Sequence, residues 1–404
     1  MSTSLLYHGF GIRGYKYLRA EYVGGEVIFT IGQEVRRLRC AGCGSARIIR
    51  RGQVTRKFRA LPIGGKPVII FLGIQRVFCF SCWGLRQVKV DFADYRRSYT
   101  KGFERYVLDL LLHMTILDVA RHLGVSWDVI KDIQKRHLKR HFSRPKLKSL
   151  RFLAIDEISI GKGQHYLTVV LDLKSGRVVY VGEGKGAEAL VPFWKRLRYS
   201  KAKIEAVAMD MSPAYINAVS TNLMGAAIVF DHFHVVKLFN EKLTKLRRDL
   251  YREATDGLQK EILKGTRWLL LKNPENLDEG RNEWQRLQEA LQLNQPLATA
   301  YYMKEELRLL WDQPDKATAE KHLTAWVARA RASGIRMLRK FANTLLAHRS
   351  GILAYYDFPI STGPLEGTNN KIKTMKRQAY GFRDMEFFKL KIMAIHQTKY
   401  ALVG

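Results

Sequence analysis

The sequence predicts a multidomain α/β protein: a cysteine-bearing β-rich N-terminal segment, a helical segment, and a mixed-sheet core interrupted by an all-α insertion. Three observations support this fold class. At 404 residues the chain is long enough for two to three domains. All four cysteines lie before residue 83. After residue 150, strand-like and helix-like apolar spacing alternate, and only helical spacing continues from residue 237 to 356.

The strong positive charge predicts a polyanionic partner. The 69 Lys and Arg outnumber the 37 Asp and Glu, giving a net charge of +32. Residues 1–150 hold 29 of these cations and 10 of the acids, and residues 151–404 hold the other 40 and 27, so both parts can contact the partner. Nucleic acid is the main candidate. An anionic membrane surface is the alternative, but a surface-bound helix would concentrate its charge on one stripe.

The N-terminus shows no targeting signal. No run of 18 apolar residues occurs, and the first residues lack an apolar signal-peptide core. We therefore expect a cytoplasmic, nucleoid-associated protein that does not bind membranes.

The cysteines form two pairs of identical spacing, Cys40 with Cys43 and Cys79 with Cys82. Two intervening residues let both thiolates of a pair bind one ion, and two pairs supply the four sulfurs of one structural Zn²⁺ site. The alternatives are four reduced cysteines or a redox-active pair.

Two β-rich runs connect the cysteine pairs. Residues 48–60 and 67–80 favour strands, and the Pro and Gly of residues 61–65 favour a turn, so we expect a zinc ribbon within residues 1–95. Cations on this hairpin are expected to contact DNA phosphates, with a solvated strand face as the alternative. These are Arg50, Arg51 and Lys57.

Helical spacing over residues 101–142, broken at residues 124–126, predicts a helix-turn-helix domain within residues 96–148. Ser126 would cap the second helix, which would turn Trp127 and Gln134 outward. Any helical hairpin with a small-residue turn gives this pattern, so the neighbouring ribbon and the charge carry part of the prediction. Expected DNA contacts on the second helix and its basic end are Lys131, Lys135, Arg136, Lys139 and Arg140.

Residues 149–236 alternate between strand and helix patterns. Three strands are followed by two helix–strand units, which is the element order of an RNase H-like core. The predicted strands are 151–158, 165–172, 177–182, 203–210 and 226–231, and the predicted helices are 187–197 and 213–223.

Two acids end up on neighbouring strands of such a sheet. Asp156 lies in the first strand and Asp210 closes the fourth. Close carboxylates repel each other unless divalent cations neutralise them, and phosphodiester chemistry with two Mg²⁺ or Mn²⁺ ions needs a third carboxylate. Taken singly, Asp210 could be a helix cap and Asp156 an edge-strand acid.

The segment 357–404 offers that third acid. A helix beginning near Pro364 places Glu366, Asn370 and Lys373 on one face, which makes Asn370 a candidate for active-site support. Glu366 could instead only complement the helix dipole. The helix also carries cations that would hold DNA beside the metals, Lys373, Lys376 and Arg377.

A long insertion separates the acids. Between Asp210 and Glu366 lie 155 residues, far more than one crossover requires. Residues 237–356 show the apolar spacing of amphipathic helices and contain no functional motif. Contacts with DNA ends, pairing between protomers and a packed helical platform remain open alternatives.

Four blocks closely resemble the DDE transposases of the bacterial ISL3 insertion-sequence family over nearly the whole chain. They are Ala154-Ile-Asp-Glu157, Asp210-Met-Ser-Pro-Ala-Tyr215, Asp231-His-Phe-His-Val-Val-Lys237 and Gly363-Pro-Leu-Glu-Gly-Thr-Asn-Asn-Lys-Ile-Lys373. The resemblance implies a zinc ribbon, a helix-turn-helix and an interrupted RNase H-like core. It implies the catalytic triad Asp156, Asp210 and Glu366.

The third block suggests further support for the site. Related transposases with a helical insertion have an acid or cysteine, two residues and then histidine, and Asp231 and His234 match this. A structural histidine is the alternative for His234.

The resemblance implies a transposase that binds terminal inverted repeats, cuts double-stranded DNA at the element's ends and joins the freed 3′ hydroxyl to target DNA. Asp156, Asp210 and Glu366 would hold two Mg²⁺ (or Mn²⁺) ions. The two ends of the element must be brought together, so we expect a homodimer on DNA.

The alternative functions are a transposon-derived DNA-binding regulator without catalysis and an RNase H-like nuclease. No nucleotide cofactor is expected, because residues 182–186 lack the P-loop spacing.

Overall fold

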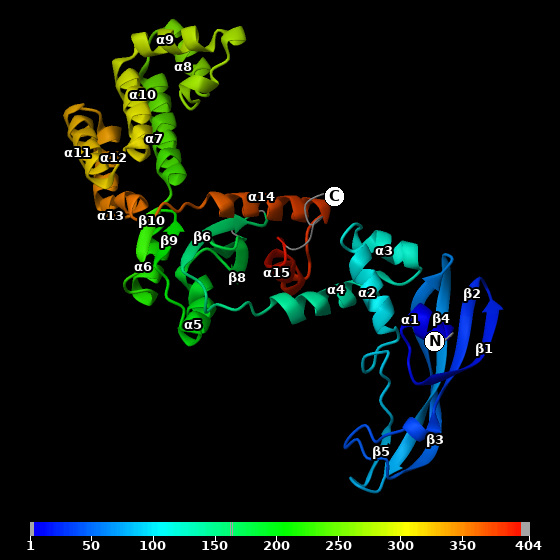
Figure 1. The fold of residues 1–404 in the computed structure, drawn as a ribbon. Helices are drawn as coiled ribbons and strands as arrows, with labels where there is room; N and C mark the ends of the chain where they lie inside the picture. Colours follow the sequence, from blue (N-terminus) through cyan, green and yellow to red (C-terminus); the bar gives the residue numbers. More distant parts are fainter. Residues whose placement is uncertain (1–3, 162, 164, 397–404) are drawn as a thin grey trace. The chain divides into compact units, whose positions relative to one another are not determined.

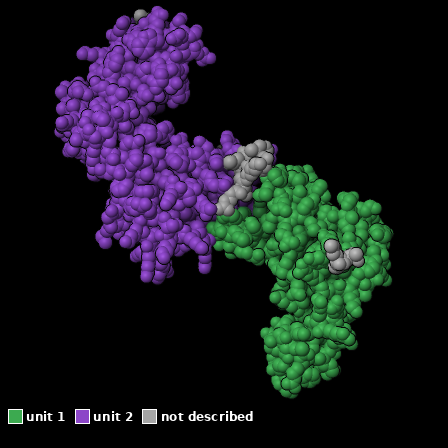
Figure 2. Space-filling view, in the orientation of Figure 1, with its two compact units in different colours: residues 1–143, 397–404 green, residues 144–396 purple. Residues whose placement is uncertain are grey.

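The computed structural model describes residues 4–161, 163 and 165–396 (Figure 1). The chain forms two compact units, one within residues 4–143 and one within residues 144–396 (Figure 2). Each unit has a hydrophobic core of its own.

The first unit combines a β-sheet with three helices that follow it. Its elements are α1 (Leu5–Phe10), β1 (Tyr15–Val23), β2 (Glu26–Gln33), η1 (Val35–Arg37), β3 (Ile48–Ile63), β4 (Lys66–Cys79), β5 (Gly84–Gln87), α2 (Lys101–Leu110), α3 (Ile116–Leu123) and α4 (Trp127–Phe142).

The sheet of the first unit has the order β1-β2-β4-β3, with β5 paired to β4. The predicted hairpin is confirmed as β3 and β4, which turn at Gly64 and Gly65 with φ angles of 56° and 77°. Strands β1 and β2 were not among the predicted elements. The two glycines between their alternating runs, Gly24 and Gly25, are the hairpin signal that indicates them.

The predicted helix-turn-helix is confirmed. Helices α2, α3 and α4 share a buried core that includes Phe103, Val119 and Ile133. Gly124 takes the left-handed conformation (φ 61°) that ends α3. Ser126 Oγ accepts the N–H of Val129 at 3.4 Å, as expected of an N-cap.

The second unit begins as a sheet and continues into helices. Its elements are β6 (Phe152–Ser159), β7 (Tyr166–Asp172), β8 (Arg177–Glu183), η2 (Ala187–Leu190), α5 (Val191–Ser200), β9 (Ala206–Met209), α6 (Pro213–Asn222), β10 (Ala227–Phe230), α7 (His232–Glu253), α8 (Gly257–Gly265), η3 (Pro274–Asn276), η4 (Glu279–Arg281), α9 (Glu283–Leu293), α10 (Gln295–Arg308), η5 (Leu309–Asp312), α11 (Lys316–Ala332), α12 (Arg336–Ala347), α13 (Arg349–Leu353), η6 (Ala354–Tyr356), α14 (Gly363–Gln378) and α15 (Met385–Met393).

The sheet of the second unit confirms the RNase H-like prediction. Its order is β10-β9-β6-β7-β8. Strands β6, β7 and β8 are antiparallel, whereas β9 is parallel to β6 and β10 is parallel to β9. Leu153 and Ile155 of β6 pack into a core with Phe193 of α5 and Tyr215 of α6. The later helices α14 and α15 contact β6 and β8 (Figure 1).

The helical insertion has its own core. Helix α7 begins directly after β10 and packs along α10 (Figure 1). Phe239, Trp326 and Phe341 form edge-to-face pairs at its centre. No helix of the described residues combines the length and apolar character that crossing a bilayer requires.

Candidate active site and DNA-binding elements

The sheet places Asp156 and Asp210 side by side. Strands β6 and β9 are paired in parallel, and continuing their register two residues past the last pair puts Asp156 opposite Asp210 on the same face. Asp156 Oδ1 accepts the N–H of Glu157 at 2.8 Å, and Asp210 Oδ1 accepts the N–H of Ser212 at 3.0 Å. Asp210 therefore stabilises the turn before α6, but the N-cap position of that helix is Ser212, so Asp210 is not the helix cap considered above.

Nearby charged groups change the pKa of the Asp156 carboxyl. Burial raises the pKa of its carboxyl, His234 and Lys237 lower it, and Asp210 raises it. His234 is half-buried in the first turn of α7. The carboxylate pair thus carries an unfavourable burial and repulsion that a divalent cation would relieve.

The amide that reaches Asp156 belongs to Asn369, on α14. Asn369 Nδ2 donates to Asp156 Oδ2 at 2.8 Å, and the Asn369 side chain is buried. Asn370, the predicted support residue, is exposed and has no hydrogen bond to either aspartate among the described residues. Asn369 lies on the apolar stripe of Leu365 and Ile372, and a polar side chain on such a stripe is the sequence signal for it.

Glu366 is exposed in the first turn of α14, one turn before Asn369. One turn corresponds to about 5 Å along a helix axis. Among the described residues only the four cysteines have ligand atoms all within 4.8 Å of one another, so the three acids do not form so compact a cluster. The structure brings Asp156 and Asp210 together and carries Glu366 on the helix that contacts the same strand. Carboxylate oxygens are ligands that Mg²⁺ prefers, so this donor set fits the ion.

Asp231 ties the start of α7 to the start of α14. Its buried carboxylate accepts the N–H of Phe233 at 2.8 Å through Oδ1. Through Oδ2 it accepts the N–H of Thr362 at 2.6 Å and also the Thr362 hydroxyl. Because Thr362 precedes α14, Asp231 fixes the helix that carries Glu366.

A polar network not predicted from the sequence lies on the opposite face of β6. Thr168 Oγ1 donates to the carbonyl of Gly184 at 2.8 Å and lies 3.0 Å from the Tyr215 hydroxyl. Burial and the charges of the two aspartates raise the pKa of Glu157 to about 7, although hydrogen bonding from Tyr215 lowers it. In the sequence, the signal for this network is the pair of adjacent acids, Asp156 and Glu157.

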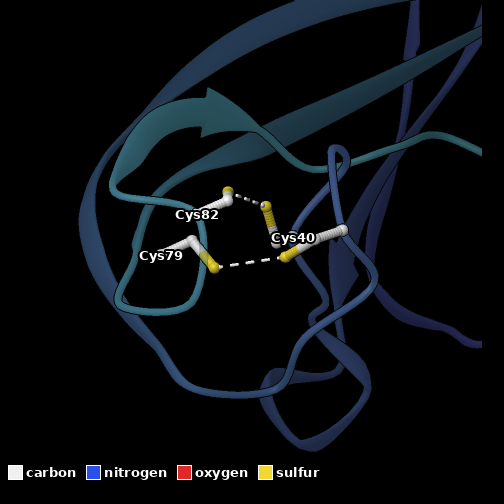
Figure 3. Close-up of side chains that lie close together, drawn as sticks. Cys40, Cys79 and Cys82 are labelled. Carbon is white, nitrogen blue, oxygen red and sulfur yellow. Dashed lines mark hydrogen bonds between the residues drawn. The ribbon is translucent and has the colours of Figure 1, made fainter.

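The four cysteine side chains converge at one end of the β3–β4 hairpin. The Cys40 and Cys82 sulfurs are 3.6 Å apart, and the Cys43 and Cys79 sulfurs are 3.5 Å apart. Figure 3 shows the side chains of Cys40, Cys79 and Cys82 pointing toward one another. All four sulfurs lie within 4.8 Å of one another, which fits a four-thiolate structural zinc site.

Backbone N–H groups prepare the sulfurs for a metal. The N–H of Gly42 donates to Cys40 Sγ and the N–H of Ser81 to Cys79 Sγ, each at 3.4 Å. Burial raises the pKa of Cys79, but the N–H groups of Cys82 and Ser81 and the Cys43 and Cys40 thiols lower it to about 6, whereas the Cys40 thiol and burial raise the pKa of Cys82 to about 12. Thiolates are the form that binds Zn²⁺, so the N–H contacts at Cys40 and Cys79 favour the bound state.

Helix α4 differs from the expectation at two positions. Gln134, expected to point outward, is buried at 9% exposure because its position on α4 faces the core of the domain. Arg136 Nη2 donates to Glu104 at 2.6 Å, and the Arg136 side chain is only 21% exposed, so this cation already has an internal partner. Trp127 is 42% exposed beneath the ammonium group of Lys131, 5.1 Å away.

The other predicted DNA contacts differ in exposure. Half-buried are Lys131, Lys135 and Lys376. Exposed are Arg50, Arg51, Lys57, Lys139, Arg140, Lys373 and Arg377.

The fold, with a zinc-ribbon-like hairpin and a helix-turn-helix ahead of an RNase H-like sheet, is that of a DDE transposase. The ISL3 DDE transposase family matches residues 153–392. The helix-turn-helix domain of transposase family ISL3 matches residues 88–138, and the zinc-finger of transposase IS204/IS1001/IS1096/IS1165 matches residues 36–82.

Two transposases of other insertion sequences are similar to this chain in sequence. The chain is 34% identical to the transposase for insertion sequence element IS1001 of Bordetella parapertussis, over 95% of this chain and 96% of that protein. It is 29% identical to the transposase for insertion sequence element IS1557 of Mycobacterium tuberculosis, over 85% and 82%. The Drosophila P element transposase strand transfer complex is similar at 9% identity with a TM-score of 0.38, over 77% of this chain and 94% of that one. This chain belongs to the ISL3 family of insertion-sequence DDE transposases.

Proposed function

We propose that this transposase binds the terminal inverted repeats of its element and catalyses DNA strand cleavage and strand transfer. The observation that carries the proposal is the pairing of Asp156 with Asp210 on adjacent strands. Helix α14, which bears Glu366, contacts the same strand through Asn369.

Asp156, Asp210 and Glu366 would hold two Mg²⁺ (or Mn²⁺) ions, which activate the attacking oxygen and stabilise the leaving oxygen of a phosphodiester. In cleavage, a water oxygen attacks the phosphorus at the element end, and the bond from phosphorus to the 3′ oxygen breaks. In strand transfer, the freed 3′ hydroxyl loses its proton and attacks a phosphorus of target DNA, whose own 3′ oxygen leaves. Both steps are direct displacements, so no Ser or Tyr nucleophile is required.

Different domains of the chain would recognise DNA and catalyse the reaction. A ribbon domain (1–95), which would hold one structural Zn²⁺, and a helix-turn-helix domain (96–148) would recognise the ends. Residues 149–236 and 357–404 would form the catalytic core around the helical insertion (237–356). Two ends must be joined, so the active form would be a homodimer on double-stranded DNA. Sedimentation with and without end-bearing DNA measures this state.

The decisive experiment is cleavage of an end-bearing duplex in Mg²⁺ by the wild type and by Glu366→Gln. We expect the variant to bind the duplex but not to cut it, because the change removes a metal-binding charge and preserves size. Glu253→Gln is the matched control: Glu253 is exposed at the last turn of α7. Robust cleavage by Glu366→Gln would remove Glu366 from the site.

The same assay separates the two rival functions. A wild type that binds ends specifically but never cuts with any divalent metal would be a DNA-binding regulator. A wild type that cuts without regard to end sequence and never joins strands would be an RNase H-like nuclease.

A further inference from the structure

A basic groove of about 700 Å³ runs along α7 in the second unit. We call it the α7 groove. Its walls carry five cations and two acids, namely Lys237, Lys245, Arg248, Arg252 and Arg267 with Glu241 and Asp249. All five cations are exposed.

The cations of the α7 groove form a linear track. Lys237, Lys245, Arg248 and Arg252 recur at helical spacing on one face of α7, whereas Phe239 on another face is buried in the insertion core. The track is about 22 Å long at 1.5 Å per residue, which matches about six base pairs of duplex.

One end of the α7 groove lies beside the edge of the sheet that carries Asp210. Phe233, in the first turn of α7, lines the groove, and Asp231, two residues before it, donates its N–H to the carbonyl of Met209 at 3.2 Å, directly before Asp210. Lys237, one turn further along α7, also lines the groove. A DNA backbone whose scissile phosphate lies at Asp156 would therefore enter the groove without leaving the protein surface.

Within the described part of the chain, four of the five groove cations have no ion pair, and Arg252 lies 3.9 Å from Asp249. Crowded cations repel one another, and a polyanion is the ligand that relieves such repulsion.

We propose that the α7 groove binds the phosphate backbone of the duplex being cut, beyond its scissile phosphate. This inference rests on the proposed function and assigns the insertion a substrate-binding role. In the proposed mechanism the cut duplex occupies the site in both steps and target DNA only in the second, and this favours the cut duplex as the occupant of the groove. Contacts of this kind are independent of sequence, because they involve phosphates and not base edges.

The test compares two triple variants with equal change in charge. The groove variant is Lys245→Ala, Arg248→Ala, Arg252→Ala; Lys237 stays intact because it lies beside Asp156. The control variant is Arg336→Ala, Arg339→Ala, Lys340→Ala, which removes three exposed cations from α12 of the same insertion. Thermal melts establish that both variants are folded.

Binding is measured without divalent metal, over a range of salt, using end-bearing duplexes shortened step by step on either side of the cleavage position. For long duplexes we expect the groove variant to lose affinity and its slope of log K against log salt to become shallower by about 2 to 3. The control variant should keep the wild-type slope. The difference should disappear once the duplex is too short on one side to reach the groove.

Three results would overturn the inference. Equal slopes in both variants would show only a general effect of charge. Unchanged binding of the cut duplex with impaired strand transfer would assign the groove to target DNA. Unchanged DNA binding with an altered oligomeric state would assign it to a protein partner. The wild type's failure to cut DNA would count against the proposed function alone, because this test measures binding.

Discussion

Asn369 and Asp156 are 213 residues apart in the sequence, yet the side-chain amide of Asn369 donates a hydrogen bond to the carboxylate of Asp156. Asp156 Oδ2 accepts this amide while Oδ1 accepts the N–H of Glu157, so hydrogen bonds orient both oxygens of the carboxylate. Amides that orient a metal-binding carboxylate act on metal affinity and rate without touching substrate. Asn369 is therefore a positioning residue in the proposed site.

The neighbouring asparagines give a matched test of this role. We expect Asn369→Ala to lower Mg²⁺-dependent cleavage by about 10- to 100-fold, the usual effect of losing such a contact. Asn370→Ala should retain near-wild-type cleavage, since Asn370 is exposed. The measurement is single-turnover cleavage as a function of Mg²⁺ concentration, in which Asn369→Ala should require more metal. Equal rates for both variants at all metal concentrations would contradict the assignment.

The choice between these two asparagines shows where sequence reasoning about the site ends. Asp156 and Asp210 could be predicted because each closes or interrupts an apolar strand, which is a local pattern. Whether Asn369 or Asn370 faces them depends on the rotation of α14 against β6. The apolar stripe of Leu365 and Ile372 indicates that Asn369 is on the buried face of α14, but the contact of this face with β6 joins segments far apart in the chain, and local spacing does not reveal it.

At the scale of elements, Asp231 connects the start of the insertion with the start of α14. Its carboxylate caps α7 and receives two hydrogen bonds from Thr362. Removing it leaves buried donors without partners, which costs about 1–3 kcal/mol for each group. The arrangement also explains why a long insertion can interrupt the core without displacing α14.

We therefore expect Asp231→Ala to lower the free energy of unfolding by about 2–4 kcal/mol and to reduce cleavage, because the start of α14 is released. Thr362→Val removes only the hydroxyl and keeps the N–H donor, so its loss should be about 1 kcal/mol. Urea unfolding of both variants measures the difference. If Asp231→Ala is no less stable than Thr362→Val, the contact of Asp231 with Thr362 contributes little to the free energy of unfolding.

The zinc ribbon is the other element that can be tested alone. The four sulfurs close one end of the β3–β4 hairpin, and a metal bound there would join β4 to the segment before β3. Cys79→Ser should abolish zinc binding and speed amide hydrogen exchange in β4 and β5, because the site links those strands. Ser81→Ala, a change beside the site, should leave one zinc per chain.

Elemental analysis and hydrogen exchange of the natively purified protein check this expectation. Exchange in β6, β7 and β9 should be unchanged in Cys79→Ser, since those strands belong to the other compact unit. Absence of zinc in the wild type would exclude the four-thiolate site. Faster exchange in both units would mean that the substitution disrupts more than the ribbon.

Prediction of the elements succeeded where the signal is local. The five strands and two helices of the catalytic sheet follow alternating and helical runs, and the order βββαβαβ then fixes the topology. The parallel pairing of β2 with β4 joins segments about 40 residues apart and has no local signature. Of the N-terminal sheet, the sequence therefore predicted the β3–β4 hairpin, whereas the addition of β1 and β2 to it emerged only in the structure.

At the scale of the whole molecule, the net charge of +32 is distributed over surfaces with different tasks. The hairpin cations Arg50 and Arg51 and the α7 groove are suited to phosphates, which are the same in every DNA sequence. Specificity for element ends must then come from side chains that reach base edges. Trp127 and Lys131, in the first turns of α4, occupy the part of a recognition helix that contacts bases.

This division of tasks predicts that two sets of substitutions affect DNA binding differently. One should lower the affinity for every duplex, and the other should lower the preference for element ends. Arg50→Ala, Arg51→Ala, Lys57→Ala should weaken binding to end-bearing and random duplexes equally and make the salt dependence shallower by about 3, since three phosphate contacts are lost. Trp127→Ala, Lys131→Ala should weaken binding to end-bearing duplexes by more than it weakens binding to random ones. Anisotropy titrations of both variants with both duplexes, over a range of salt, give the four affinities. If the hairpin variant loses preference for ends while the α4 variant keeps it, the ribbon and not the helix-turn-helix reads the sequence.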